Sequence, residues 1–261
     1  MTLCLETIGL SKSFGGVKAV SDVNLTVESG QVYCIIGPNG AGKTTFFNLV
    51  SGIEPPTSGR VLFNGQDVTG KQVFEISRLG AGRTFQNIRL FGKISVLENV
   101  LVGMHYHLKE GLMSSILATP GHKATEKMAE SKAREILDFV GMAHLENELA
   151  ENLPYGSQRR LEIVRALVSN PKLLMLDEPT AGMNPKEALD LMQLIRRIRE
   201  LGPTILFIEH NIPVVMGVSN RIMVLSFGKT IAEGTPEEVR NNPQVIEAYL
   251  GPNEEEVACN A

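Results

Sequence analysis

The sequence predicts an α/β protein whose parallel sheet is accompanied by a strand-rich beginning and an inserted helical lobe. Two short apolar runs, residues 31–36 and 172–177, end at a glycine-rich turn and at an acidic turn, as buried parallel strands do. Strands and helices alternate again after Pro171, which is typical of a parallel sheet. The 261 residues suffice for one large domain with a sizeable core.

The first part of the chain is rich in predicted strands. Residues 17–27 alternate loosely and suggest strands, and residues 31–36 form a strand that runs into the glycine-rich turn. A helix is expected over 43–49, with Gly52 ending it, and residues 61–65 predict a strand that enters a turn.

The rest of the chain changes character twice. Between about 95 and 168 it becomes helical, with helices expected over 125–140 and 157–168. A strand over 172–177, a helix over 185–200 whose first residue is a proline, and strands over 204–208 and 221–225 then follow. We divide the chain into one domain, 1–251, and a flexible tail, 252–261. Within the domain, 1–88 and 166–235 form the α/β core, 89–165 the helical lobe with an insertion at 104–122, and 236–251 the C-terminal helices.

Composition restricts the classes of function. A net charge of −4 offers no basic field, so a nucleic-acid partner is not expected. No apolar run approaches the roughly 20 residues of a membrane helix, and the first residues do not resemble a signal peptide. Cys4, Cys34 and Cys259 have no metal-ligand spacing, and Cys34 lies in an apolar run as a small core residue would. The chain therefore reads as cytoplasmic, where thiols stay reduced.

The glycine-rich turn fits the phosphate-loop pattern GxxxxGK[ST] between a strand and a helix. Its glycines let backbone N–H groups point at phosphate oxygens, and the following helix adds its positive end. We expect Lys43 to reach the β- and γ-phosphates and the Thr44 hydroxyl to hold Mg²⁺. The loop residues predicted to bind ATP are Gly37, Pro38, Asn39, Gly40, Ala41, Gly42, Lys43, Thr44 and Thr45.

Polar side chains also follow two later strands of the predicted sheet. Asp177 and Glu178 end the strand 172–177 at the edge where ligands of open α/β sheets bind. Asp177 is placed to hold Mg²⁺, directly or through water, and Glu178 to polarise the attacking water as general base. His210 follows the strand 204–208 on the same edge, where it can donate a hydrogen bond to the γ-phosphate.

A further segment, Leu153-Pro-Tyr-Gly-Ser-Gln-Arg-Arg-Leu161, lies ahead of a predicted helix and resembles the signature segment of ABC ATPases. The resemblance extends over residues 3–251 and includes similar motifs in the same order. These are the Q-loop Thr84-Phe-Gln86, the acidic motif Asp177-Glu-Pro-Thr180, the D-loop Ala181-Gly-Met-Asn184 and the switch histidine in Glu209-His210. It implies a P-loop NTPase (RecA-like) core with an antiparallel β subdomain and an inserted helical lobe.

The resemblance also implies roles and partners. Gln86 would contact Mg²⁺, sense the γ-phosphate and report to a membrane partner, and Phe14 would stack on adenine, unless it is an ordinary core phenylalanine. ATP and Mg²⁺ are the implied cofactors. The implied partners are a second ABC ATPase subunit, two membrane permease subunits and, indirectly, a substrate-binding protein, at the cytoplasmic face of the inner membrane. The segment expected to reach the partner's ATP is Tyr155, Gly156, Ser157 and Gln158.

The signature departs from the usual family pattern. Pro154 stands where serine is usual, and Ser157 stands where glutamine is usual. Pro154 has neither a hydroxyl nor an N–H, and a lost hydrogen bond to a charged group costs about 1.5–3 kcal/mol. Asn184 stands where the D-loop often carries aspartate. These departures lead to the hypothesis that the chain pairs with a related cassette of orthodox signature, in which case Lys43 and Glu178 belong to the stronger site.

Softer signals point to one subgroup. The segments 83–87, 155–163, 234–239 and 245–251 and the extra stretch 104–122 resemble the larger ATP-binding subunit of bacterial branched-chain amino acid importers. His105, His107 and His122 in that stretch are expected to be solvated and not metal ligands, since no further ligand residues accompany them. The alternatives are the ATPase of a lipid or lipopolysaccharide exporter, a urea importer, or a soluble ABC ATPase. Soluble members that act in translation usually carry two cassettes, and those in DNA repair carry long coiled coils.

Overall fold

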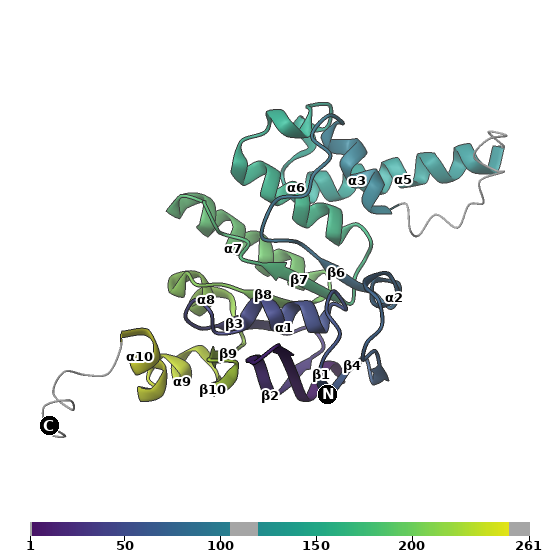
Figure 1. Cartoon of the computed structure of the whole chain (residues 1–261). Helices are drawn as coiled ribbons and strands as arrows, with labels where there is room; N and C mark the ends of the chain where they lie inside the picture. Colours follow the sequence, from purple (N-terminus) through teal and green to yellow (C-terminus); the bar gives the residue numbers. More distant parts are fainter. Residues whose placement is uncertain (1, 105–119, 251–261) are drawn as a thin grey trace, which may run out of the picture.

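The computed structural model describes residues 2–104 and 120–250 and contains two sheets (Figure 1). A four-stranded antiparallel sheet has the order β2-β1-β4-β5, and a six-stranded sheet has the order β10-β9-β3-β8-β7-β6. The predicted α/β class, with an antiparallel β subdomain and an inserted helical lobe, is confirmed. The strands are β1 (Leu3–Phe14), β2 (Val17–Glu28), β3 (Val32–Ile36), β4 (Ser58–Phe63), β5 (Gln66–Asp67), β6 (Ala81–Arg83), β7 (Leu173–Asp177), β8 (Thr204–Ile208), β9 (Arg221–Ser226) and β10 (Lys229–Gly234).

Helices connect these strands and build the upper lobe of Figure 1. Their bounds are α1 (Lys43–Val50), α2 (Val73–Arg78), α3 (Val96–Met104), α5 (Pro120–Phe139), η2 (Ala143–Leu145), η3 (Ala150–Asn152), α6 (Tyr155–Leu167), α7 (Pro185–Glu200), α8 (Ile212–Val218), α9 (Pro236–Arg240) and α10 (Pro243–Leu250). None of the helices in the described ranges is long and apolar enough to cross a membrane.

The antiparallel sheet depends on turns that favour glycine. β4 and β5 are joined by Asn64 and Gly65, whose φ angles are 48° and 76°. Positive φ at both central residues is the requirement of a type I′ hairpin turn, which matches the twist of the strands. β1 was not predicted as a separate strand, because its polar residues and its register shifts against β2 break the alternation.

Every residue of β3, β7 and β8 is buried. Successive side chains of a strand point to opposite faces, so each strand contributes to two cores. In β3, Cys34 packs in the core shared with the helical lobe, whereas Tyr33 and Ile35 pack in the core shared with α1 and the antiparallel sheet. The expectation that Cys34 is a core residue is confirmed, and the parallel sheet is covered on both faces.

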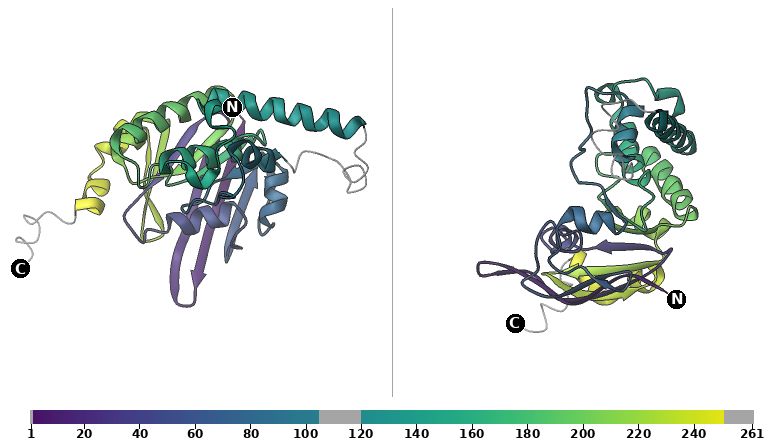
Figure 2. Two further views of the ribbon diagram at one scale, coloured as in Figure 1. Left: turned by 90° about the horizontal axis from the view of Figure 1, so that it is seen from above. Right: turned by 90° about the vertical axis from the view of Figure 1, so that its right-hand side faces the viewer.

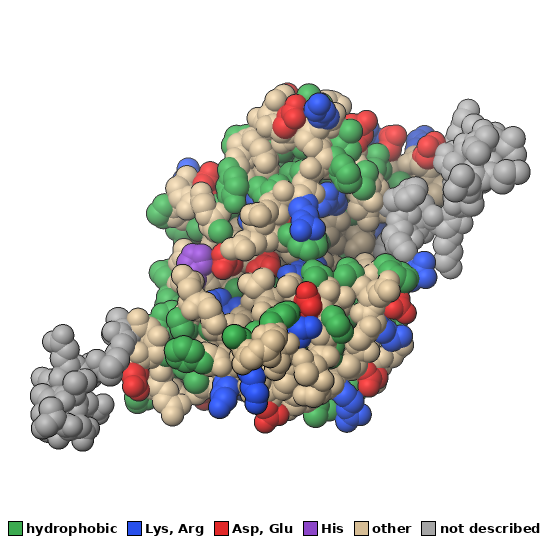
Figure 3. Space-filling view, viewed as in Figure 1, with side chains coloured by type: hydrophobic (Ala, Val, Ile, Leu, Met, Phe, Trp, Pro, Cys, Tyr) green, Lys and Arg blue, Asp and Glu red, His purple; other side chains and the backbone are tan. Residues whose placement is uncertain are grey.

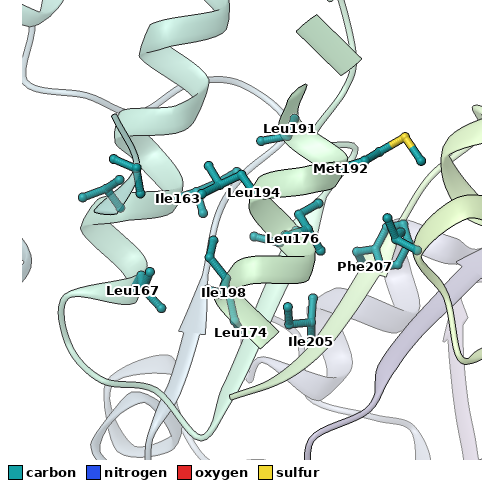
Figure 4. Close-up of a cluster of buried hydrophobic side chains, with 14 of the residues drawn as sticks. Ile163, Leu167, Leu174, Leu176, Leu191, Met192, Leu194, Ile198, Ile205 and Phe207 are labelled. Atoms are coloured by element: carbon teal, nitrogen blue, oxygen red, sulfur yellow. The ribbon is translucent and has the colours of Figure 1, made fainter. Parts of the chain in front are cut away.

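Helices α6 and α7 cover one face of the parallel sheet. Figure 4 shows their side chains packed over β7 and β8. The helix predicted over 185–200 coincides with α7, which Asn184 caps by accepting a hydrogen bond from the Glu187 N–H at 3.0 Å. The residues labelled in this cluster are Ile163 and Leu167 of α6, Leu191, Met192, Leu194 and Ile198 of α7, Leu174 and Leu176 of β7, and Ile205 and Phe207 of β8.

The helical lobe differs from the prediction at two boundaries. α6 begins at Tyr155 and not at residue 157, because the Pro154 carbonyl accepts hydrogen bonds from the Ser157 and Gln158 N–H groups at 2.9 and 3.0 Å. The signature segment therefore forms the first turn of the helix. At its other end, α6 stops at Leu167, one residue before the predicted end at 168.

The long helix α5 begins at Pro120, five residues before the predicted start, and Figure 2 shows it running outward beyond the sheets. The predictions for His105, His107, Cys259 and the tail 252–261 lie outside the described residues, as does most of the insertion 104–122. His122 lies within α5, but its side chain is outside the described set.

Candidate functional site

The strand order brings the predicted site residues to one edge of the parallel sheet. β3 pairs with β8, β8 with β7 and β7 with β6, all in parallel. The carboxyl ends of these strands therefore lie side by side, and they lead to the phosphate loop, His210, Glu178 and Gln86 respectively. Acidic and histidine side chains gather in the band between the upper and lower lobes in Figure 3.

The phosphate loop has a backbone that only glycine can supply at two positions. Gly37 and Gly42 have φ angles of 151° and 98°. A Cβ at Gly37 would collide with the carbonyl oxygen of Leu225, and one at Gly42 would collide with that of Ala19. The loop is thus packed tightly against β2 and β9, which fixes its curl before any ligand arrives.

Lys43 begins α1 and turns back into the loop. Its Nζ donates hydrogen bonds to the carbonyl oxygens of Gly37 at 2.7 Å and Pro38 at 3.0 Å. Burial lowers the pKa of Lys43, and the negative charge of Glu178 opposes that shift. The ammonium group therefore has only carbonyl partners inside the loop, where phosphate oxygens would be stronger ones.

Asp177 ends β7 and is 3% exposed. Its Oδ2 accepts a hydrogen bond from Arg83 Nη2 at 3.2 Å. Burial raises the pKa of Asp177, and the positive charge of Arg83 opposes that shift. Arg83 also donates to the Phe47 carbonyl at 3.1 Å and to Asn48 Oδ1 at 2.9 Å, so it ties α1 to β7.

Sequence reasoning did not assign Arg83 to the site. It appeared there only as part of a segment that resembles one subgroup. A charged residue on the strand that leads into the Q-loop was the available signal, because charges inside a buried strand are rare unless they are paired. The pairing itself involves residues far apart in the chain, and only the folded sheet brings them together.

Glu178 lies where the loops that follow β6, β7 and β8 approach one another. Its Oε2 accepts a hydrogen bond from Gln86 Nε2 at 3.2 Å and lies 3.9 Å from His210 Nδ1. Its φ angle of 46° is unusual for a residue with a side chain and stores backbone strain, which structures concentrate at functional sites. The His210 side chain is 58% exposed, which leaves it accessible to a ligand.

Glu209 precedes the predicted site residue His210, and its buried carboxylate forms hydrogen bonds to two loops. From the sequence alone it was named only as part of the motif Glu209-His210. It is 0% exposed. One carboxylate oxygen accepts from the Thr180 N–H and hydroxyl at 2.9 and 2.5 Å, and the other accepts from the N–H groups of His210 and Asn211 at 3.0 and 3.2 Å. Glu209 therefore joins the acidic motif after β7 to the histidine loop after β8.

Phe14, at the end of β1, is 48% exposed. The alternative of an ordinary core phenylalanine is therefore wrong. Lys12 places its Nζ 5.0 Å from the centre of the ring, which leaves part of the aromatic surface open. An exposed aromatic face of this kind can stack on a planar base.

The signature residues Tyr155 to Gln158 lie in the first turn of α6. α6 packs on one face of the parallel sheet, whereas α1, which follows the phosphate loop, packs on the other. The fold therefore does not gather the two predicted phosphate-binding segments on one side of the sheet. Asn184 lies at the start of α7, where its side chain and that of Glu187 cap the helix reciprocally.

The oxygen groups at the edge suit Mg²⁺. Thr44 offers a hydroxyl, Gln86 an amide oxygen and Asp177 a carboxylate, and hard oxygen ligands are those that Mg²⁺ prefers, together with phosphate oxygens and water. The ranges 2–104 and 120–250 contain no cluster of three or more His, Cys, Asp or Glu side chains able to hold a metal ion. Hydroxyl, amide and carboxylate oxygens of this kind are ligands that suit a nucleotide-bound Mg²⁺.

A groove opens beside the Q-loop between the core and the helical lobe. Its volume is about 460 Å³, and α2, β6, α3, α6 and the Q-loop line it. Val73, Phe91 and Val102, which line it, are exposed by 43%, 54% and 44%. Large apolar side chains exposed around a concave surface mark an interaction site.

A glycine-rich strand–loop–helix unit, an acidic strand end and a histidine after the neighbouring strand lie on one parallel sheet with an inserted helical lobe, which is the architecture of an ATP-binding cassette. The family model described as "ABC transporter" matches residues 20–181, and a second, "Branched-chain amino acid ATP-binding cassette transporter", matches residues 229–251. The chain belongs to the ABC transporter family and is an ATP-binding and ATP-hydrolysing cassette.

The similar proteins extend over the whole domain. The "High-affinity branched-chain amino acid transport ATP-binding protein LivG" of Escherichia coli (strain K12) is 48% identical over 95% of this chain and 97% of its own length. The crystal structure of the ADP conformation of MJ1267, an ATP-binding cassette of an ABC transporter, has a TM-score of 0.84 at 35% identity, covering 97% of this chain and 100% of that one. A dimeric post-hydrolysis structure of the cassette MJ0796, bound to ADP and Pi, has a TM-score of 0.75 at 25% identity, covering 89% and 98%.

Proposed function

We propose that this cassette powers an importer of branched-chain amino acids. The observation that carries the proposal is the extent of the similarity to LivG, which covers 95% of this chain and includes more than the nucleotide site. The second family match, at residues 229–251, falls on β10, α9 and α10, which come after the predicted catalytic motifs. Similarity outside the ATPase motifs is what separates a subgroup from the family at large.

Hydrolysis in this proposal centres on Glu178. A water molecule attacks the γ-phosphorus of ATP, Glu178 takes the proton of that water, and ADP leaves in line. In the structure, Gln86 Nε2 donates a hydrogen bond to Glu178 Oε2 at 3.2 Å. This hydrogen bond has to break when the attacking water binds to that oxygen. His210, 3.9 Å from that oxygen, donates a hydrogen bond to the γ-phosphate.

The remaining residues bind the nucleotide. Lys43 exchanges its two carbonyl partners for β- and γ-phosphate oxygens, and Phe14 stacks on adenine. Thr44, Gln86 and Asp177 would hold Mg²⁺, directly or through water. When bound, Mg²⁺ neutralises charge that develops on the phosphate oxygens. The buried Asp177 side chain bonds to Arg83 through Oδ2, so its geometry is held by a fixed partner.

The active form in this proposal is a head-to-tail dimer of cassettes. α6 and the phosphate loop's helix α1 pack on opposite faces of one sheet, so the signature of one chain serves the ATP of the other. Pro154 at the start of α6 supplies no side-chain cap. We therefore favour a heterodimer with a related cassette of orthodox signature, in which Lys43 and Glu178 of this chain make the stronger site.

Two permease subunits complete the transporter, and a substrate-binding protein delivers the amino acid to them. The groove beside the Q-loop receives a short permease helix, which places this chain at the cytoplasmic face of the inner membrane. The exposed apolar side chains that line the groove, Val73, Phe91 and Val102, support this docking.

Uptake of radiolabelled leucine in a strain lacking this chain tests the proposal. Wild-type protein is expected to restore uptake and the Glu178→Gln variant is not. Affinity purification from membranes is expected to recover two permeases and a second cassette. Unchanged leucine uptake in the deletion strain, or recovery of a soluble dimer without permeases, would overturn the importer assignment. In the paired complex, ATP turnover that survives Glu178→Gln nearly unchanged would overturn the assignment of the stronger site.

A further inference from the structure

A buried ion pair on the signature helix has no role in the hydrolysis described above. Arg159 and Glu162 lie one turn apart on α6, and each side chain is 1% exposed. Arg159 Nη1 donates to Glu162 Oε2 at 2.8 Å. A buried ion pair has to satisfy its remaining hydrogen-bonding groups, because desolvation otherwise outweighs the attraction between the charges.

Most of those remaining groups bond to the backbone of the Q-loop, whereas Arg159 Nε has no hydrogen-bond partner among the described residues. Arg159 donates from Nη1 to the Phe85 carbonyl at 2.6 Å and from Nη2 to the Gln86 carbonyl at 2.5 Å. Glu162 Oε1 accepts from the N–H groups of Phe85 at 3.4 Å and Arg89 at 3.3 Å. The planar guanidinium thus bridges two successive carbonyls, which is a geometry that lysine cannot reproduce.

The Q-loop depends on these bonds. Residues 84–94 form neither helix nor strand, so their backbone groups lack the partners that regular structure provides. The pair on α6 supplies four such partners within five residues of chain. The position of the Gln86 backbone is therefore set by the signature helix and not by β6 alone.

The same pair touches the other functional segments. Arg159 Nη2 donates to the Tyr155 hydroxyl at 3.3 Å, and Tyr155 opens the signature turn. Gln86 in turn reaches Glu178. Phe85, Arg89 and Glu162 all line the groove beside the Q-loop. One buried cluster thus contacts the groove, the signature turn and the residue that bonds to Glu178.

We propose that Arg159 and Glu162 form a clamp that makes the Q-loop and the signature helix one moving unit, as positioning residues for Gln86. An occupant that displaces the groove wall then shifts Gln86 and the signature turn together. The effect of that shift on ATP turnover rests on the proposed catalytic role of Glu178. The effect of the clamp on the Q-loop backbone does not depend on that role. The two are tested by different measurements.

The backbone is tested first, by amide hydrogen exchange on the full chain. In Arg159→Lys and Glu162→Gln, peptides covering 84–93 are expected to exchange faster, with little change in the strands of the core. The matched control is Arg160→Gln, the neighbouring arginine on α6, whose side chain is 29% exposed and pairs with Asp190 at 3.6 Å on the surface. Exchange of 84–93 that stays at the wild-type rate in both clamp variants would overturn the clamp whatever the role of Glu178.

Steady-state ATP hydrolysis then tests positioning. Arg159→Lys is expected to lower kcat by about ten- to a hundredfold, because small misplacements cost that much. KM for ATP is expected to stay within about twofold, since Lys43 and its loop make no contact with the pair. A Tm within about 3 °C of wild type would exclude unfolding as the cause. A kcat within twofold of wild type, or a loss of kcat that only follows the Tm, would overturn the proposal.

The double variant Arg159→Met/Glu162→Leu separates positioning from stability. Apolar residues of similar size often replace a buried ion pair without loss of stability, but they cannot bond to the Q-loop backbone. A folded double variant with low kcat and fast exchange at 84–93 supports the clamp, and one with wild-type kcat refutes it. If this variant does not fold, exchange in Arg159→Lys decides. Glu178→Gln is measured in parallel, and residual turnover there would refute the catalytic assignment but not the clamp.

Discussion

Removing the Glu209 carboxylate is expected to destabilise the protein and to slow hydrolysis. The side chain is 0% exposed and accepts four hydrogen bonds, two from Thr180 and one each from the N–H groups of His210 and Asn211. A hydrogen bond to a charged group contributes about 1.5–3 kcal/mol, but such contributions are not additive and water can enter the space. We therefore expect Glu209→Ala to cost about 3 kcal/mol of the free energy of unfolding.

For a domain of this size, that cost corresponds to a fall in Tm of about 6–12 °C. Glu209→Gln keeps the shape of the side chain and one acceptor oxygen, but it turns an amide N–H₂ toward the remaining donors. Its Tm is therefore expected to lie between those of wild type and Glu209→Ala. Calorimetry measures Tm, and ATP titration measures kcat and KM. Because Glu209 holds the loop of His210 and not the phosphate loop, kcat should fall more than KM rises.

The control is Glu200→Ala at the exposed end of α7, where Tm should change by no more than about 2 °C. The reasoning would be refuted by a Tm of Glu209→Ala within about 2 °C of wild type, because four bonds to a buried carboxylate cannot be lost at so small a cost. It would also be refuted by a KM that rises as much as kcat falls.

Three further outcomes are expected. Phe14→Ala should raise KM for ATP about tenfold with little change in Tm, because a half-exposed ring adds stacking but little core; an unchanged KM would exclude stacking. Chelation of divalent cations should stop hydrolysis and added Mg²⁺ should restore it, whereas activity in excess chelator would contradict a Mg²⁺ site. Gly37→Ala should abolish ATP binding or folding, because its Cβ would clash with the Leu225 carbonyl. Gly40→Ala has free space around its Cβ and should cost only about 1–2 kcal/mol of the free energy of unfolding. Equal effects of the two variants on Tm and ATP binding would contradict the packing of the loop.

Elements that carry their own signal could be predicted from the sequence. The strand over 204–208 and the helix over 185–200 match β8 and α7 at both ends, because an apolar run and a proline at a helix start are local features. β1 and α2 were not predicted, since polar residues interrupt the first and the second has only six residues. The start of α6 was misplaced because a proline cap acts through its carbonyl, which leaves no side-chain pattern.

The parts of the candidate site that escaped prediction share a physical cause. Arg159 and Glu209 are buried charges, the Arg83 side chain is only 9% exposed, and all three have partners in other elements. A charge inside a sequence pattern is usually read as a solvated residue, and only the fold shows that its partners surround it. Glu178 and His210, which come after β7 and β8 where strands were predicted, belong to motifs that are contiguous in sequence. Their roles stay predictions until the variants are measured.

The buried charges also explain how an open sheet edge can be rigid. Arg83 holds Asp177, Arg159 holds the Gln86 backbone, and Glu209 holds the loop of His210. Each of these bonds is partly buried, so it is stronger than a bond exposed to water, and breaking it would leave a charge without that partner. The ends of β6, β7 and β8 are therefore positioned by side chains that do not themselves face the nucleotide. We therefore expect a change at any one of these bonds to shift the loop that it holds.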